Sequence, residues 1–370
     1  MPLHRTVKST YLSSLDSLSR SRLFDYKWLV EQELDSWKTW IDLPVSERVA
    51  LWRRGFTSPN GVLYDFETHD PEAYVSELQR YRLYRALNGD HRYLIDDKLS
   101  QHWMLSEHER HRPTAFGVVD RGYIHEVAGT EFDGGPKPVS EWVFPTLRRE
   151  SKLVLKQLRG LGGKEVIVLA YDDGSYSIDG VPADRETVRE RVVGLSEYLA
   201  TEYVSQHDYA DALYQDAANT IRVLTLWDDR RRELLVPMAV QRVGTDRSRP
   251  VDNWSVGGLS ARIERSTGRL TAAARLSPAG VLEWYDEHPD TGTPIEGVTV
   301  PRWDDVLATV ERIARENTNI PMIGWDVLLS ENGTPVVLEA NTGTDLDLMQ
   351  VHRPLLDDPA VAAVVSQHLQ

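Results

Sequence analysis

One stretch near the carboxyl end constrains the fold of this 370-residue chain more than any other. Residues 324–329 and 335–341 form two mainly apolar runs, and the polar residues 330–333 between them contain an Asn-Gly pair. An Asn-Gly pair between apolar runs is a strong signal for a β-hairpin. The segment therefore predicts two antiparallel strands joined by a tight turn.

Oxygen-bearing side chains stand at the strand ends of this hairpin, namely Asp326, Glu339 and Asn341. Glu339 and Asn341 are two residues apart, so they share one face of a strand, and Asp326 can lie opposite them. Carboxylate and amide oxygens suit Mg²⁺ or Mn²⁺, and protein-bound Mg²⁺ usually also contacts substrate phosphates. The alternative is a solvated hairpin with ordinary acidic ends, because short motifs often match by chance.

Composition narrows the class of protein. The chain has no cysteine, which excludes disulfides, thiolate metal sites and cysteine nucleophiles. Its 41% hydrophobic and 27% charged residues are typical of a soluble globular protein. A net charge of −15 argues against nucleic-acid binding. No apolar run approaches the ~20 residues of a membrane span, and the first residues lack a signal-peptide pattern. We therefore expect a cytoplasmic protein of two or three structural units.

A second motif reads as strand, glycine-rich loop, strand. Residues 152–156 and 165–169 are the two strand-like runs. The loop between them holds Gly160, Gly162 and Gly163. Glycines let backbone N–H groups approach a polyphosphate closely, and Lys156 ends the first run beside them. No helix follows the loop, so it is neither a Walker loop nor a dinucleotide fingerprint. The motif predicts a phosphate flap in preference to a plain hairpin with a flexible tip.

Two more cationic residues stand at the ends of predicted elements. Lys98 follows Asp96 and Asp97 at a helix start, where aspartates are favourable and a lysine is not. This placement indicates an anionic partner, or else a solvated first turn. Arg222 lies near the start of the predicted strand 219–226, and arginine is the usual fork for a phosphate or carboxylate.

The remaining pattern is mainly helical at first and then rich in strands. Residues 1–90 read as mostly helical, and residues 234–300 as mostly strands. The predicted helices are 25–40, 70–88, 184–199, 302–317 and 357–369.

In type and order, these residues resemble the ATP-grasp superfamily. The matching series is Lys98, Lys156 with its glycine loop, residues 201–204, Arg222, Asp326 and Glu339-Ala340-Asn341. The thirteen-residue interval from Asp326 to Glu339 is similar to the metal site of D-alanine–D-alanine ligases. The blocks 219–222, 252–258, 288–290 and 324–326 look more like the sugar-transfer-associated ATP-grasp branch, over roughly residues 90–360.

The resemblance implies an α+β, ATP-grasp fold in which two α+β lobes clasp ATP. It divides the chain into an N-terminal helical region, 1–90, an N-terminal lobe with the flap, 91–204, and a C-terminal lobe with the metal site, 205–370.

The same resemblance implies roles for single residues. Asp326, Glu339 and Asn341 would hold Mg²⁺, or Mn²⁺ in its place. Arg222 would face the transferred phosphate or an acyl-phosphate, and Lys156 would share in catalysis. Lysines would contact the ATP phosphates, glycines would close over them, and the hinge would meet adenine through its backbone. This nucleotide-binding set is Lys98, Lys156, Gly160, Gly162, Gly163, Glu202, Tyr203 and Val204.

The chain departs from the family pattern at two positions. Thr201 stands where a hinge glutamate is common, so Glu202 is expected to take the acidic role. Gly324 stands where the D-alanine–D-alanine ligases carry an arginine, two residues before the first metal aspartate. Stabilisation of a tetrahedral intermediate must then come from elsewhere, for example from Arg222 or Lys164, or the chemistry differs.

The implied activity is ATP- and Mg²⁺-dependent ligation of a carboxylate to an amine through an acyl-phosphate. The substrates would be small molecules: a sugar, an amino acid or a precursor of a cell-surface polysaccharide. A homodimer or a sugar-transfer enzyme as partner is also consistent with the resemblance. The loop 342–350 is expected to line the acceptor site, where Asp345 and Asp347 either hold an amine or are solvated. The alternatives are a kinase on the same scaffold and a non-catalytic nucleotide-binding partner of a polysaccharide machine.

Overall fold

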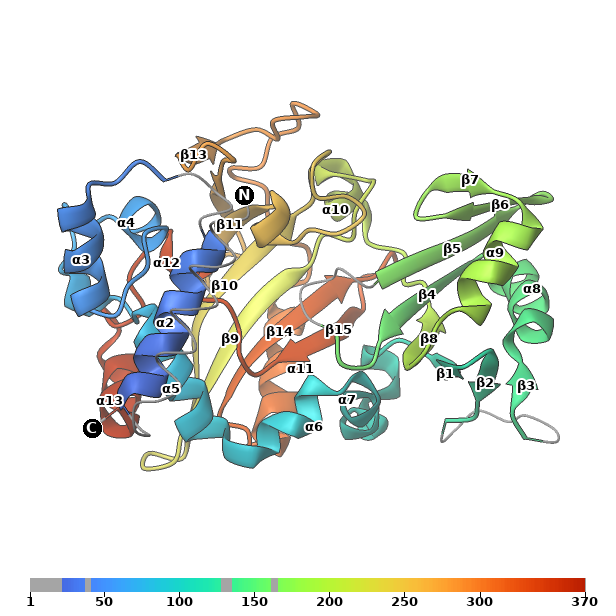
Figure 1. Ribbon diagram of the computed structural model, residues 1–370, viewed down its shortest axis with the longest axis horizontal. Coiled ribbons are helices and arrows are strands. Elements are labelled where there is room, and N and C mark those ends of the chain that lie inside the picture. The colour runs from blue at the N-terminus through green and yellow to red at the C-terminus, as the bar shows by residue number, and fades with distance from the viewer. Residues whose placement is uncertain (1–21, 37–40, 128–134, 161–165, 370) are drawn as a thin grey trace.

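The computed structural model describes residues 22–36, 41–127, 135–160 and 166–369, which form an α+β protein with two antiparallel sheets (Figure 1). In Figure 1 the eight-stranded sheet lies on the right, the seven-stranded sheet in the centre and the first helices on the left. This arrangement confirms the predicted α+β class with a mainly helical N-terminal region. No helix in the described part of the chain is both long enough and apolar enough to cross a bilayer.

The eight-stranded sheet has the order β3-β2-β1-β8-β4-β5-β6-β7. Its strands are β1 (Ala115–Asp120), β2 (Tyr123–His125), β3 (Lys137–Pro138), β4 (Lys152–Gln157), β5 (Val166–Asp172), β6 (Ser175–Ile178), β7 (Val181–Ala183) and β8 (Tyr198–Glu202). Helices α8 (Val139–Glu150) and α9 (Arg185–Val193) cover one face. Leu147 and Val188 from these helices pack there against Leu155 and Leu169 of the sheet. The other face of β4 and β5 is left to line a cavity.

The seven-stranded sheet has the order β13-β12-β11-β10-β9-β14-β15. Its strands are β9 (Ile221–Asp228), β10 (Glu233–Val243), β11 (Leu259–Ile263), β12 (Leu270–Leu276), β13 (Leu282–Tyr285), β14 (Met322–Leu329) and β15 (Pro335–Asn341). Helix α11 (Trp303–Glu316) packs Val310 against one face, beside Val223 and Trp325. Leu224 and Val240 face the opposite side, toward α5 (Glu77–Asn88) and α13 (Pro359–His368).

The other helices are short or lie in the first part of the chain. They are α2 (Arg22–Ser36), α3 (Val45–Arg53), α4 (Asn60–Leu63), α5 (Glu77–Asn88), α6 (Tyr93–Asp96), α7 (Lys98–Met104), α10 (Asp208–Leu213), α12 (Asp347–Gln350) and α13 (Pro359–His368). Short 3₁₀ helices are η1 (Pro71–Ala73), η2 (Gly89–Arg92), η3 (Ser106–His111) and η4 (Trp254–Val256).

Both sequence motifs form the predicted strand pairs. Strands β14 and β15 pair antiparallel around the turn at 330–333, and β4 and β5 pair antiparallel around the glycine loop. Lys98 opens helix α7, where Asp97 caps the N-terminus by accepting from the backbone N–H groups of Leu99 and Ser100. Asp97 therefore stabilises the helix N-terminus, as its position predicted. The Lys98 side chain takes no part in this cap and reaches Gly160 and Glu339 instead.

Two predicted helices are wrong in extent. The helix expected over 184–199 ends at Val193, and Tyr198–Glu202 is strand β8 between β1 and β4. The helix expected over 70–88 is broken: η1 stops at Ala73, and α5 begins anew where Ser76 and Gln79 form a reciprocal capping box. In the first case sheet pairing of Tyr198–Glu202 limits the helix, and in the second a new N-terminal cap restarts it; apolar periodicity predicts neither.

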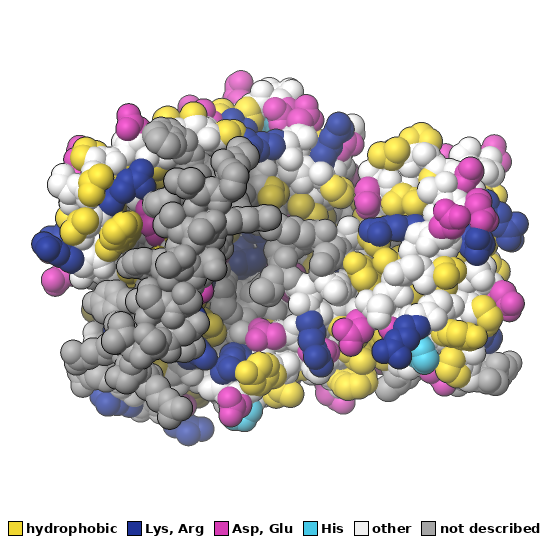
Figure 2. Space-filling view, viewed as in Figure 1, with side chains coloured by type: hydrophobic (Ala, Val, Ile, Leu, Met, Phe, Trp, Pro, Cys, Tyr) yellow, Lys and Arg dark blue, Asp and Glu magenta, His cyan; other side chains and the backbone are white. Residues whose placement is uncertain are grey.

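On the face shown in Figure 2, basic and acidic side chains of the described residues are scattered among one another. Charged side chains of both signs also line the cavity between the two sheets, where Lys98, Lys156, Arg222 and Arg242 meet Asp252, Asp326 and Glu339.

Candidate active site

A cavity of about 810 Å³ lies between the open face of the eight-stranded sheet and one end of the seven-stranded sheet. Its lining brings together all residues of the predicted catalytic, nucleotide-binding and metal sets that lie in the described part of the chain, but not Asp345 or Asp347 of the loop expected at the acceptor site. The residues brought together are Lys98, Lys156, Gly160, Glu202, Tyr203, Val204, Arg222, Asp326, Glu339 and Asn341. Gly162, Gly163 and Lys164 lie outside the described residues.

The upper wall of the cavity is built by alternate residues of two strands. Lys152, Val154 and Lys156 of β4 face the cavity, while Leu153 and Leu155 between them are in the core. This is the two-residue period of a β-strand. Val166, Val168 and Ala170 of β5 continue the same surface. The wall therefore offers an apolar surface with a lysine at each end, which suits a flat ring joined to a charged chain.

Residues 202–204, which the resemblance makes a hinge, line the cavity beside this wall. Strand β8 ends at Glu202, whose carboxylate accepts a hydrogen bond from the backbone N–H of Thr114 at 2.8 Å. Tyr203 follows, with Lys152 Nζ 4.6 Å from its ring centre, and burial raises the pKa of its hydroxyl. Thr201 is buried, while Glu202 lines the cavity. The carboxylate of this segment thus belongs to Glu202, although Thr114 already uses part of its hydrogen-bonding capacity.

Two lysines meet at the opposite, charged end. Lys98 Nζ donates to the carbonyl oxygen of Gly160 at 3.0 Å and lies 3.2 Å from Glu339 Oε1. It therefore joins the start of the glycine loop to the hairpin. Burial lowers the pKa of Lys156, Glu339 acts against this shift, and Lys98 adds to it. Asp326 also acts against the shift, so two ammonium groups and two carboxylates meet at this end of the cavity.

The hairpin places its oxygen ligands on adjacent strands. Asp326 of β14 lies directly opposite Glu339 of β15, and Asn341 lies opposite Gly324. The register shifts at this point, because Val327 pairs with Val337 and Leu338 is the extra residue. Such a bulge re-aims side chains, and here Leu338 and Glu339 both reach the cavity. The sequence predicted the facing carboxylates but not the bulge.

Asp326 is held by three hydrogen-bonding side chains. Arg222 grips it side-on, with Nε 2.5 Å from Oδ1 and Nη2 2.9 Å from Oδ2. Arg242 Nη1 donates to Oδ2 at 3.1 Å, and Asn341 Nδ2 donates to the same oxygen at 3.3 Å. Burial alone would raise the pKa of Asp326, but Arg222 and Arg242 outweigh it and hold that pKa below its usual value.

Arg242, which the sequence did not single out, is fixed from behind by Asp252. Arg242 Nη2 lies 2.7 Å from Asp252 Oδ1, and Thr220 donates its backbone N–H and its hydroxyl to Oδ2 at 2.7 and 2.6 Å. Burial raises the pKa of Asp252, against the effect of Arg242. One signal could have indicated Arg242: it is a charged residue near the end of an otherwise mainly apolar strand, β10, in which its neighbours are buried.

Gly324 leaves space that other side chains fill. A Cβ at this position would lie 2.3 Å from Thr344 Oγ1 and 3.3 Å from Arg222 Cδ. Arg222 Nη1 also donates to Thr344 Oγ1 at 2.8 Å. The arginine absent at 324 is therefore replaced in this region by arginines from β9 and β10.

The donor set fits a hard divalent cation. Asp326, Glu339 and Asn341 offer only oxygen ligands along one edge of the cavity. Within the described residues, Lys98 is the only ion-pair partner of Glu339. The Asn341 amide donates through Nδ2, which leaves its carbonyl oxygen for another partner. The surrounding lysines and arginines favour a cation that arrives together with phosphates over one that binds alone.

Two facing antiparallel sheets, with a cationic and oxygen-rich edge between them, define an ATP-grasp protein. The sugar-transfer associated ATP-grasp family matches residues 78–357, and the chain belongs to this family.

Solved structures to which the chain is similar include three enzymes. An N5-carboxyaminoimidazole ribonucleotide synthetase in complex with ADP is 11% identical, with a TM-score of 0.40, and the match covers 72% of this chain and 52% of that one. The ATP-grasp ligase PsnB with a minimal precursor is 12% identical, with a TM-score of 0.40 and coverages of 76% and 64%. An L-amino acid ligase from Bacillus licheniformis is 12% identical, with a TM-score of 0.33, and the match covers 68% of this chain and 41% of that one.

The chain spans about half of the length of the synthetase it matches. No curated protein matches the chain.

Proposed function

We propose that this protein is an ATP- and Mg²⁺-dependent ligase that joins a carboxylate to an amine through an acyl-phosphate. The observation that carries the proposal is the convergence, at one end of an apolar cavity, of Lys98 and Lys156 with Arg222 and the oxygen ligands Asp326 and Glu339. In this arrangement adenine lies between β4–β5 and the hinge at Tyr203–Val204, and the phosphates point toward the hairpin.

In the first step a carboxylate oxygen of the acid attacks the γ-phosphorus of ATP. The new oxygen–phosphorus bond forms as the bond to the bridging oxygen breaks, and ADP leaves with that electron pair. Lys98 and Lys156 neutralise charge on the phosphate oxygens. A divalent cation held by Asp326, Glu339 and Asn341 would supply further neutralisation of phosphate charge.

In the second step the amine nitrogen attacks the acyl carbon. The carbon–nitrogen bond forms, the carbon–oxygen bond to phosphate breaks, and the nitrogen loses a proton to solvent. Gly160 and the glycines that follow it would close over the phosphates and keep water from the acyl-phosphate. The side chains position and stabilise charge and form no covalent bond to substrate.

Finer features of this function are also proposed. The family description names sugar transfer, so we propose a sugar, an amino acid or a cell-surface polysaccharide precursor as the acid or the amine. We further propose a cytoplasmic setting, Mg²⁺ as the usual metal, and a homodimer or a sugar-transfer enzyme as partner. The glycine-loop lobe at 91–204 would move relative to the metal-site lobe at 205–370 to admit substrates, with 1–90 attached to the latter.

An ADP-release screen tests the proposal. Amino acids, uronic acids and nucleotide sugars are supplied with Mg²⁺-ATP and with hydroxylamine as the amine. The proposal predicts ADP release that requires both an acid and Mg²⁺ and yields an equal amount of hydroxamate. A stable phosphorylated product without hydroxamate would instead indicate a kinase. Tight ATP binding without turnover across the whole panel would indicate a non-catalytic partner.

A further inference from the structure

The two guanidinium groups at the floor of the cavity form one unit. Arg222 on β9 and Arg242 on β10 approach the same carboxylate, that of Asp326, from adjacent strands. Both arginines are buried, at 7% and 8% exposure. Arg222 is steadied by Thr344 and Arg242 by Asp252, so neither depends on Asp326 alone for its position.

The charges of this unit balance only while Asp326 belongs to it. Arg222 and Arg242 face Asp326 and Asp252, which makes two positive and two negative groups. If Asp326 turns toward a divalent cation, Arg242 keeps its ion pair with Asp252, whereas Arg222 loses its ion-pair partner and keeps only the weaker effects of Glu339 and Asp252. Buried arginines without an anion are costly, so the pair would then require a new oxyanion.

The geometry also indicates which anion fits. Arg222 already holds a carboxylate side-on through two parallel N–H bonds, the arrangement that matches planar carboxylates and phosphates. Arg242 adds a donor from a second direction, which suits a group with oxygens out of one plane. An acyl-phosphate and the phosphate it releases both have this shape.

The family resemblance already implies that Arg222 faces the transferred phosphate or an acyl-phosphate. We propose that Arg242 joins Arg222 in one binding site, or seat, for this phosphoryl group, and that Asp326 occupies the seat until Mg²⁺ and nucleotide bind. Arg242 is thereby a second anion-binding arginine, and Asp252 is its positioning residue. This inference rests on the proposed function. It adds an order of events: oxyanion binding is coupled to metal–nucleotide binding, because both depend on where Asp326 points.

The test uses inorganic phosphate, a product of the proposed reaction, as the probe. Binding of radiolabelled phosphate to the full-length protein is measured by equilibrium dialysis with Mg²⁺-ADP, and with ADP plus a chelator. We expect phosphate affinity to be at least about tenfold higher with Mg²⁺-ADP. Equal phosphate affinity in the two conditions would overturn the proposal that Asp326 leaves the arginines when Mg²⁺ and nucleotide bind.

Variants separate the seat from the nucleotide site. Arg242→Ala is expected to weaken phosphate binding by about tenfold or more while Mg²⁺-ADP affinity changes less than about twofold. Arg242→Lys keeps the charge near Asp252 and Asp326, so it should fold readily and show a smaller loss. Asp252→Asn should also lower phosphate affinity, without lowering the affinity for Mg²⁺-ADP.

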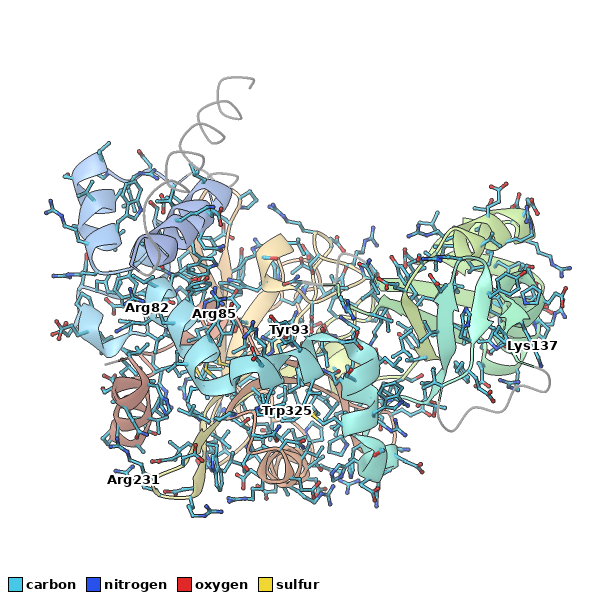
Figure 3. All side chains as sticks on the ribbon, turned by 60° about the horizontal axis from the view of Figure 1, so that its bottom comes forward. Arg82, Arg85, Tyr93, Lys137, Arg231 and Trp325 are labelled. Carbon is cyan, nitrogen blue, oxygen red and sulfur yellow. The ribbon has the colours of Figure 1, made fainter. Side chains whose placement is uncertain are left out.

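The control is Arg231→Ala, at the turn of the same β9–β10 hairpin, which lies at the edge of the molecule in Figure 3. It removes the same charge far from the cavity and should leave phosphate binding unchanged. Phosphate affinity that is equal in wild type, Arg242→Ala and Arg242→Lys, in protein that binds Mg²⁺-ADP normally, would refute the seat and leave the proposed nucleotide function intact. If the wild-type protein does not bind Mg²⁺-ADP, both the arginine seat and the proposed nucleotide function are refuted.

Discussion

Lys156 lines the cavity from strand β4, whose alternate residues Leu153 and Leu155 belong to the core. The sequence could single it out, because a lysine at the end of an apolar strand before glycines is a local pattern. Arg242 was missed for the opposite reason. Its importance depends on Asp252 and on Asp326, which lies 84 positions away in the chain. Contacts over such separations leave no periodic signal in one sequence.

Lys156→Ala should weaken Mg²⁺-ATP affinity by about tenfold, because it removes one ammonium group from the phosphate end. Isothermal titration measures the affinity, and Lys137→Ala serves as the control, since Lys137 lies at the far edge of the eight-stranded sheet (Figure 3). Unchanged affinity in the Lys156 variant would support the plain-hairpin interpretation of the loop.

Glu339→Gln should lower turnover by about a hundredfold or more, because it removes one of the two carboxylate charges among the proposed metal ligands. The free energy of unfolding should change by less than about 1 kcal/mol, since this side chain is one-third exposed, at 32%, and pairs only with Lys98 among the described residues. Steady-state ADP release and urea unfolding measure the two effects. Glu283→Gln, which alters a paired carboxylate on β13 outside the cavity, should keep normal turnover. Near-normal turnover in Glu339→Gln would rule out the metal assignment.

At the scale of elements, successive side chains of the β14–β15 hairpin point in turn to the hydrophobic core and to the cavity. Trp325 points into the core, where its indole N–H donates to Thr225 at 2.8 Å, and it lies near the centre of Figure 3. Its neighbour Asp326 points into the cavity. The hairpin was predictable because turn and periodicity agree. The extent of the helix after Asp184 was not, because pairing of β8 with β1 and β4 decides where that helix must end.

Gly324→Ala tests the close contact at the hairpin. The new methyl group would overlap Thr344 Oγ1 and press on Arg222. We expect a loss of about 1–3 kcal/mol in the free energy of unfolding, measured by chemical denaturation, and weaker phosphate binding. Adding Thr344→Ala or Thr344→Gly to this variant should recover part of the stability, and no recovery would place the strain elsewhere.

At the scale of the whole molecule, the first helices are tied to the loop that follows the metal strand. Tyr64 and Asn60 donate to Asp347 at 2.5 and 2.9 Å, and Arg80 donates to the carbonyl oxygens of Gly343 and Thr344. Asp347 is therefore not a solvated loop charge. Sequence patterns predicted helices in this region but not where they dock, because docking depends on pairs such as Tyr64 and Asp347, 283 residues apart.

The Asp347 carboxyl makes stability depend on pH. Burial raises its pKa well above the usual value, and Asp345 and Glu77 add to the effect, against Tyr64 and Arg80. Above the ordinary aspartate pKa of about 3.9, the folded protein keeps a proton that the unfolded chain releases, so this contribution to stability is lost as pH rises toward the raised pKa. Asp347→Asn should remove that loss, because an amide can still accept from Tyr64 and Asn60.

Unfolding by urea at several pH values between about 4 and 8 measures this effect. The stability of Asp347→Asn relative to wild type should increase with pH. A difference that is constant over this range would show that Asp347 titrates normally.

The central claim is that the acid is activated by transfer of the γ-phosphoryl group to its carboxylate. The direct test uses the acid identified by the ADP-release screen, labelled with heavy oxygen in its carboxylate, together with its amine. Mass spectrometry of the released inorganic phosphate should show one labelled oxygen, carried over when the acyl–oxygen bond breaks. Released phosphate without label, at full amide yield, would contradict an acyl-phosphate and with it this account of the site.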